Sequence, residues 1–140
     1  MKHLKRILFA LFFIIFSCDV EDLHELCGKS AIINNALFTT TNTDNYSITD
    51  VKITGNCLTI TISSSGCSGN SFMATLVDSE YYISNGSSDY RQLKLSLETN
   101  EACLALVSKE FSFDIGNLQT VNLTTYINLE KWNEQLIYNY

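Results

Sequence analysis

Residues 48–62, ITDVKITGNCLTITI, contain two runs in which apolar and polar side chains alternate, separated by Gly55-Asn56. Alternation with a period of two is typical of strands that bury one face. A glycine supplies the positive φ that a two-residue hairpin turn requires. The segment therefore predicts an antiparallel β-hairpin.

The turn also predicts the register of this hairpin, because opposed residues lie on the same face of the sheet. On the apolar face we expect three pairs: Ile53 with Leu58, Val51 with Ile60, and Thr49 with Ile62. On the other face we expect Thr54 opposite Cys57 and Lys52 opposite Thr59. Cys57 then points away from the apolar stripe, so a segment over the outer face or edge should supply its partner. Cys27 fits that description.

Shorter alternating runs follow the hairpin, with polar turns between them. We expect strands in residues 71–77, 80–84, 92–98, 102–115, 121–129 and 136–140. Residues 31–33 and 36–38 fit either a short strand or a turn of helix, and 39–45 read as a loop. Beyond residues 1–18, no long window has a helical period. The prediction is an all-β domain at residues 47–140, a single antiparallel β-sandwich or small barrel of about six to eight strands.

The chain begins with MKHLKRILFALFFIIFSC, residues 1–18. A basic start and an apolar run, Ile7 to Phe16, are typical of a secretory signal, and the run is shorter than the roughly 20 residues that span a bilayer. The ending Ile15-Phe16-Ser17-Cys18 resembles the lipobox of bacterial lipoproteins. That resemblance implies removal of residues 1–17 and acylation of Cys18, with palmitate as the expected lipid. The alternative is an ordinary signal cleaved elsewhere, which leaves Cys18 as a free or disulfide-bonded cysteine.

Residues 18–46 are expected to form an acidic tether and an N-terminal strap. Asp19-Val20-Glu21-Asp22 resembles the acidic segment that directs lipoproteins of the Bacteroidota to the outer face. The resemblance implies an exported protein, lipid-anchored in the outer membrane and exposed at the surface. A solvated tether is the alternative.

Charge restricts the partners. Without residues 1–17 the chain has 123 residues, with six Lys and Arg against 15 Asp and Glu, a net charge of −9. Such a chain has no electrostatic basis for binding nucleic acid, and anionic lipid headgroups should repel it. We therefore expect membrane association through the lipid anchor.

Four cysteines follow Cys18: Cys27, Cys57, Cys67 and Cys103. An even number in an exported chain predicts two disulfides, for which three connectivities exist. The chain has no CxxC pair, and His24 is the one histidine beyond the leader. Clustered metal ligands are therefore missing, and we expect neither a metal nor a cofactor.

A second resemblance covers residues 47–120. It is carried by residues 50–56, 58–61, Gly66-Cys67, Phe72, 93–95, Ala102-Cys103-Leu104-Ala105 and Phe111-Ser112-Phe113-Asp114. These segments resemble small uncharacterised lipoproteins of the Bacteroidota. The resemblance implies a Cys67–Cys103 bridge, which leaves Cys27–Cys57, in agreement with the hairpin register. The chain departs from the pattern at Asn70, where histidine is frequent. No activity comes with the resemblance.

Catalysis is not expected. Nucleophilic catalysis needs a base near the nucleophile, and only His24 follows the leader. Acidic residues fall mainly in turns and on polar strand positions, where solvation explains them. A small hydrolase would require a base that the sequence does not offer.

Binding remains. Tyr81, Tyr82 and Tyr90 flank the Ser/Asn/Gly loop 84–89, and loops of this composition suit glycan or protein ligands. Tyrosines on half-buried strands are the alternative interpretation. We therefore expect a non-catalytic, disulfide-stapled binding or accessory module. The alternative is a structural or assembly subunit of an outer-membrane protein complex, whose last strand, 136–140, pairs with a partner's sheet edge.

Overall fold

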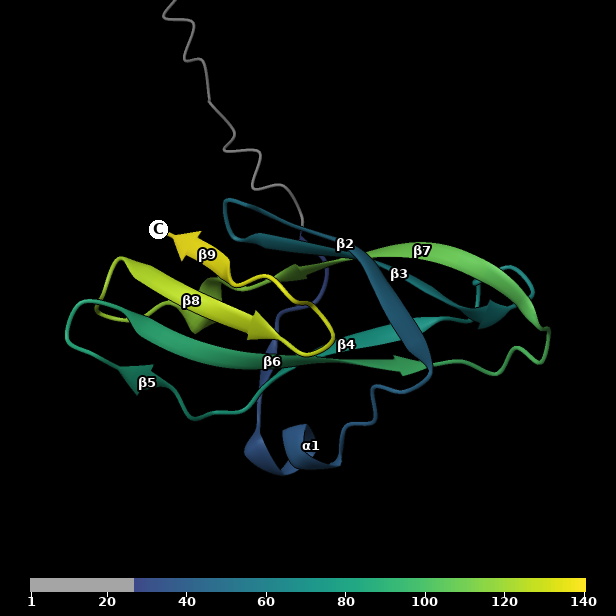
Figure 1. Cartoon of the computed structure of the whole chain (residues 1–140), viewed down its shortest axis with the longest axis horizontal. Coiled ribbons are helices and arrows are strands. Elements are labelled where there is room, and N and C mark those ends of the chain that lie inside the picture. Colours follow the sequence, from purple (N-terminus) through teal and green to yellow (C-terminus); the bar gives the residue numbers. More distant parts are fainter. Residues whose placement is uncertain (1–26) are drawn as a thin grey trace, which may run out of the picture.

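Two β-sheets face each other across one hydrophobic core in the computed structural model, which describes residues 27–140 (Figure 1). The three-stranded sheet has the order β2 (Tyr46–Thr54), β3 (Cys57–Gly66), β7 (Ala105–Asp114). The six-stranded sheet has the order β1 (Ile32–Ile33), β4 (Met73–Asp78), β6 (Asp89–Glu98), β8 (Thr124–Leu129), β9 (Leu136–Asn139), with β5 (Ile83–Ser84) also on β6. Both sheets keep open edges, so the two-layer all-β prediction is confirmed and the barrel alternative is not adopted.

The strands are not all antiparallel. The pairs β1–β4 and β6–β8 are parallel, and the other pairs are antiparallel. The reason for the β6–β8 pair is topological. After β6 the chain crosses to the other sheet to form β7 and then returns as β8, and a crossover of this kind joins parallel strands.

The hairpin prediction is confirmed at the turn and wrong at its far end. Gly55 has a φ of +55°, and Ile53 pairs with Leu58 and Val51 with Ile60. A β-bulge between Ile48 and Asp50 then shifts the register, so Ile48 rather than Thr49 lies opposite Ile62. The extra residue lets Ile48 pack against the core while Thr49 stays exposed. Burial of an isoleucine in place of a threonine favours this bulge.

Other boundaries differ from the prediction. Residues 105–114 form one strand, β7, and β8 begins at Thr124 rather than at Val121, which is 97% exposed. Hydrogen bonds explain the late start of β8. The Thr120 hydroxyl and the Asn122 amide both donate to the buried carboxylate of Asp89, which holds this segment as a loop.

A short helix, α1 (Asn35–Thr40), follows β1, so the loop expected at 39–45 begins two residues late. The side chain of Asn34 caps α1 by accepting a hydrogen bond from the Leu37 N–H at 2.9 Å. Asn is among the residues preferred at this position. Of the two ambiguous segments, residues 32–33 form a strand and 36–38 lie in α1.

The disulfides have the predicted pairing. Cys27 is joined to Cys57, with 5.3 Å between their Cα atoms, and Cys67 to Cys103, with 4.9 Å. Next to Cys27, the chain lies so close to β7 that a Cβ on Gly28 would overlap the Ser112 carbonyl oxygen. Gly28 therefore permits the close approach that the Cys27–Cys57 bridge needs.

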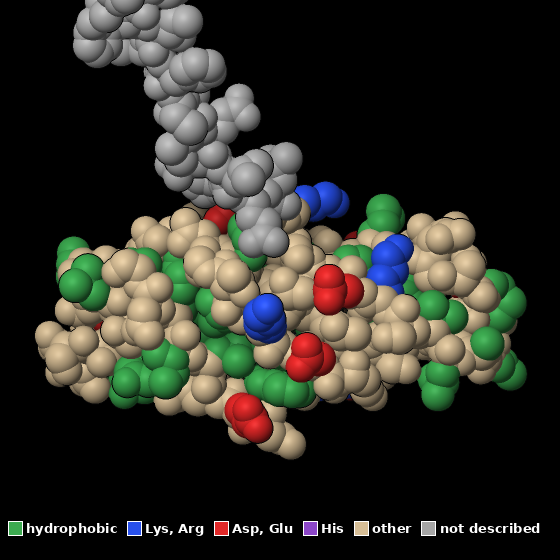
Figure 2. All heavy atoms as spheres, turned by 90° about the horizontal axis from the view of Figure 1, so that it is seen from above, with side chains coloured by type: hydrophobic (Ala, Val, Ile, Leu, Met, Phe, Trp, Pro, Cys, Tyr) green, Lys and Arg blue, Asp and Glu red, His purple; other side chains and the backbone are tan. Residues whose placement is uncertain are grey.

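The core lies between the sheets. Leu58, Ile60 and Ile62 of β3 and Leu76, Leu93 and Leu95 of β4 and β6 are fully buried. Seen from above, the molecule presents mostly uncharged polar side chains and backbone, with hydrophobic side chains at both ends and near the middle and a few charged side chains between them (Figure 2). Within residues 27–140, no helix is long and apolar enough to cross a membrane. Cys18, His24 and the acidic segment 19–22 lie outside the described residues.

Candidate functional site

A groove lies between α1 and the outer face of the six-stranded sheet. The helix α1 is at the bottom of Figure 1. The loop after β4, residues 79–82, the first residue of β5, Ile83, and the outward-facing side chains of β6 and β8 complete its walls. Its volume of about 420 Å³ lies within the range of roughly 300–1,000 Å³ that is usual for ligand sites.

Three aromatic side chains border the groove: Phe38 of α1, Tyr81 of the loop and Tyr90 of β6. The Tyr90 ring stacks on Tyr126 of the neighbouring strand, with 5.1 Å between ring centroids and 18° between planes. Its hydroxyl also accepts a hydrogen bond from the Asn85 amide at 3.4 Å. Because both ends of Tyr90 are held, its orientation is set before any ligand arrives.

The polar lining consists mainly of amides and hydroxyls. Gln92 of β6, Asn128 of β8 and Asn35 of α1 all contribute, and none of the described residues that line the groove is charged. Within residues 27–140, the side-chain amides of Gln92 and Asn35 make no hydrogen bond. Aromatic faces beside unpaired amides suit a ligand that has both apolar faces and hydroxyl groups.

A buried ion pair supports the loop that carries Tyr81. Arg91 donates to Asp78 Oδ1 at 3.0 Å, and both side chains are almost inaccessible. The same oxygen accepts the Glu80 N–H at 2.8 Å, and the Ser79 N–H donates to the Gln92 carbonyl at 3.1 Å. Burial raises the pKa of Asp78, and the Arg91 charge partly offsets that rise. The wall that carries Tyr81 is therefore fixed to the core.

The structure separates the three predicted tyrosines. Tyr81 and Tyr90 line the groove together. Tyr82 instead stacks on Arg91, with 5.1 Å between the centroid of the Tyr82 ring and Arg91 Cζ. Ligand contact by any of the three stays a prediction.

Sequence reasoning missed Phe38, Gln92 and Asn128. The outward positions of the alternating runs, Tyr90-Gln92 and Tyr126-Asn128, carry a signal for the last two. Phe38 belongs to a segment whose secondary structure was ambiguous, and nothing local places it over another strand.

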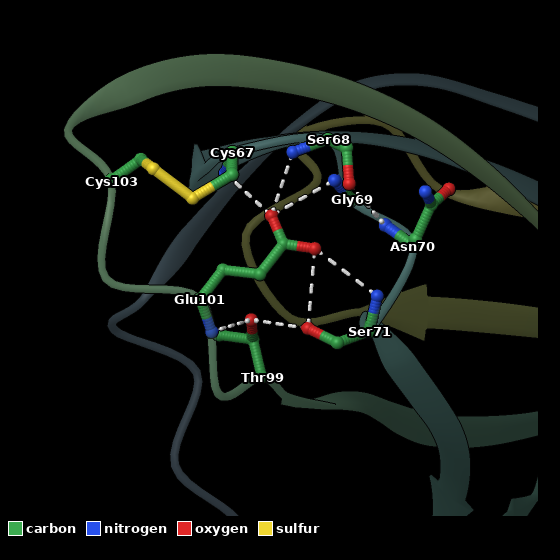
Figure 3. Close-up of a disulfide and its surroundings, with 8 residues drawn as sticks. All are labelled: Cys67, Ser68, Gly69, Asn70, Ser71, Thr99, Glu101 and Cys103. Carbon is green, nitrogen blue, oxygen red and sulfur yellow. Dashed lines mark hydrogen bonds between the residues drawn. A yellow bond between two sulfur atoms is a disulfide. The ribbon is translucent and has the colours of Figure 1, made fainter.

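A second polar cluster surrounds the Cys67–Cys103 bridge (Figure 3). The Glu101 carboxylate accepts backbone N–H bonds from Ser68 at 2.8 Å, Gly69 at 3.0 Å and Ser71 at 3.1 Å, and one from Cys67. These bonds lower the pKa of Glu101 to about 2. The turn binds the chain's own carboxylate, so this cluster is structural. Across residues 27–140, no group of three or more His, Cys, Asp or Glu side chains is placed to hold a metal ion.

No family model matches the sequence, and no curated protein matches it. Two solved structures have a similar fold. One is a protein of unknown function, DUF1344, from Bacteroides vulgatus ATCC 8482, with a TM-score of 0.54 and 15% identity over 81% of this chain and 57% of that chain. The other is a putative toxin related protein from Parabacteroides distasonis ATCC 8503, with a TM-score of 0.52 and 16% identity over 81% of this chain and 61% of that chain.

The present chain thus spans less than two thirds of either protein. At such identities the likeness concerns the fold alone. The fold and its cysteines define the class: an all-β domain of two sheets with two disulfides.

Proposed function

We propose that this chain is a non-catalytic binding module that takes its ligand in the groove between α1 and the six-stranded sheet. One observation carries the proposal: Phe38, Tyr81 and Tyr90 converge with unpaired amides in a hollow of ligand size. The stacked Tyr90–Tyr126 pair and the ion pair beneath the loop support it further, because a rigid site loses less entropy on binding.

The module is exported and anchored by lipid at Cys18 in the outer membrane, facing outward. The leader with its lipobox supports the anchor, and two disulfides suit an oxidising compartment.

Two measurements on the full-length protein test the groove. In the first, the protein is applied to an array of immobilised oligosaccharides, and the binding of Tyr90→Ala is compared with that of Tyr82→Ala. Tyr82 is the matched control because it is also a tyrosine and lies outside the groove. Tyr90→Ala should weaken binding about tenfold or more, whereas Tyr82→Ala should bind like the wild type.

The second measurement covers protein ligands. Benzoylphenylalanine in place of Thr39, which lines the groove, should crosslink to the ligand in intact cells. The same residue in place of Leu106, which is 79% exposed at the start of β7, should not give that product. A groove that captures neither a glycan nor a protein would contradict the proposal.

The alternative function, an assembly subunit, has one specific observation in its favour. Among the described strands, β9 pairs with β8 alone and lies at the end of its sheet, where Ile137 is 55% exposed. An open edge can accept a partner's strand. Co-purification of one stoichiometric partner after crosslinking, lost on Ile137→Pro, would favour this function.

A further inference from the structure

The groove continues into a second hollow. This hollow, of about 270 Å³, is bordered by Phe38, Gln92 and Asn128, which also border the first, and by residues 129–130. Gln92 and Asn128 are paired across the parallel strands β6 and β8. The two hollows therefore follow one another along these strands, from the level of Tyr90 to that of Glu130, with Phe38 shared between them.

The electrostatics of the two hollows are close to neutral. The first has no charged residue among the described ones that line it. In the second, the Glu130 carboxylate already accepts a hydrogen bond from the Thr43 hydroxyl at 2.6 Å and lies 3.3 Å from Lys94 Nζ. Lys94 Nζ in turn lies 4.7 Å from the centroid of the Phe38 ring. The two charges near the groove, Glu130 and Lys94, are thus paired with each other.

The chain as a whole is acidic, with a net charge of −6. An anionic ligand would approach against this charge and would find no unpaired cation among the described groove residues. A ligand without charge meets neither penalty. Its hydroxyls can pair with the amides, and its apolar faces can rest on the aromatic rings.

We propose that the two hollows are adjoining subsites for an uncharged oligosaccharide, which extends along β6 and β8 and passes Phe38. This inference rests on the proposed binding function and adds the class of ligand. A chain of several sugar units fills both hollows, whereas one or two units fill the first. Gln92 serves both subsites, so the gain in affinity with chain length depends on it.

The test is calorimetric titration of the full-length protein with neutral oligosaccharides of increasing length. The probes are the malto-, cello-, xylo- and manno-oligosaccharides from two to six units, with oligogalacturonate and heparin fragments as acidic probes. At least one neutral series should gain about tenfold in affinity from the dimer to the hexamer. Its affinity should be the same at low and high salt, because charge screening does not act on it.

The variant Gln92→Ala removes an exposed side chain with no hydrogen bond in the described part of the chain, so the fold should tolerate it. The hexamer meets Gln92 from both hollows and the dimer from the first alone, so the variant should weaken the hexamer more than the dimer. We expect the gain in affinity with length to fall to less than about twofold. Ser96→Ala, on the same strand and face but outside both hollows, is the control. Phe38→Ala should act in the same direction as Gln92→Ala.

The outcomes separate the two proposals. Salt-sensitive binding confined to the acidic probes, or affinity that does not depend on length, overturns the oligosaccharide inference and leaves the binding groove in place. Capture of a protein through residue 39, with no glycan bound, likewise overturns the oligosaccharide inference and leaves the binding groove in place. Absence of both glycan binding and crosslinking overturns the proposed function itself.

Discussion

The Glu101 carboxylate accepts a hydrogen bond from the backbone N–H of Ser68 at 2.8 Å, across 33 residues of sequence (Figure 3). Because Cys103 and Cys67 flank these two residues and are joined to each other, the same loops are held together by a covalent bond and by a charge-assisted one.

The first prediction concerns pH. The pKa of Glu101 is lowered from 4.5 to about 2 by the N–H groups of Gly69, Ser68 and Ser71. The unfolded chain therefore takes up this proton first as the pH falls. The stabilisation from Glu101 is complete above about pH 4.5 and is lost as the pH falls toward 2. Urea unfolding should show Glu101→Gln clearly less stable than the wild type at neutral pH, with the gap closing in this acidic window.

Glu98→Gln is the control for that experiment, because Glu98 is exposed and makes no hydrogen bond in the described part of the chain. It should follow the wild type at every pH. A stability gap for Glu101→Gln that stays constant with pH would show that the turn does not hold an ionised carboxylate.

The second prediction concerns the Cys67–Cys103 bridge. Its removal by Cys67→Ser should lower the free energy of unfolding by about 2–5 kcal/mol, because the unfolded chain regains the freedom of a 36-residue loop. Cys103→Ser should cost about the same, and the double variant no more than either. Melting under oxidising conditions measures this, and an unchanged melting temperature would rule it out.

The third prediction concerns the buried pair of Asp78 and Arg91. Arg91→Met should destabilise the fold by about 3–5 kcal/mol, because Asp78 is left buried and charged without its partner. Burial already raises the pKa of Asp78, and loss of the opposing charge should raise it further. The folded variant therefore binds a proton more readily than the unfolded one, so the deficit should shrink as the pH is lowered toward the ordinary pKa of 3.8.

A double variant, Asp78→Asn with Arg91→Met, should recover part of that loss and should lack the dependence on pH. Equilibrium unfolding across acidic and neutral pH compares the three proteins. If Arg91→Met lost the same stability at every pH, the charge of Asp78 would not be the cause.

The fourth prediction concerns Cys18. With an alkyne analogue of palmitate in growing cells, the wild type should be labelled and should sediment with membranes, whereas Cys18→Ser should be unlabelled. Protease treatment of intact cells then reports the leaflet: loss of the wild-type domain, while a periplasmic control survives, is the expected result. Labelling of Cys18→Ser would refute anchoring at this residue.

Local sequence was sufficient for the parts of the fold that depend on neighbouring residues. The hairpin turn follows from Gly55-Asn56, and the outward direction of Cys57 follows from the alternation, which led to Cys27 as its partner. Tyr81 and Tyr90 were picked out because they flank one loop, and they do line one groove.

Long-range packing decided the rest. The bulge at Thr49 exists because Ile48 gains more from the core than a regular ladder would give, which the spacing to the turn does not reveal. The parallel pairing of β6 with β8 depends on the route of the chain through the other sheet. The alternation of apolar and polar residues does not indicate in which direction a strand runs.

By itself, the sequence of this protein determined an all-β class and the turn of its first hairpin, because both follow from the pattern of neighbouring side chains. Only the tertiary structure decided that Phe38, Tyr81, Tyr90, Gln92 and Asn128 meet in one groove. They come from a helix, a loop and two strands. Burial of inward-facing side chains in the core holds the two strands side by side. The helix α1 has no buried residue, and the pairing of β1 with β4 just before it sets its place.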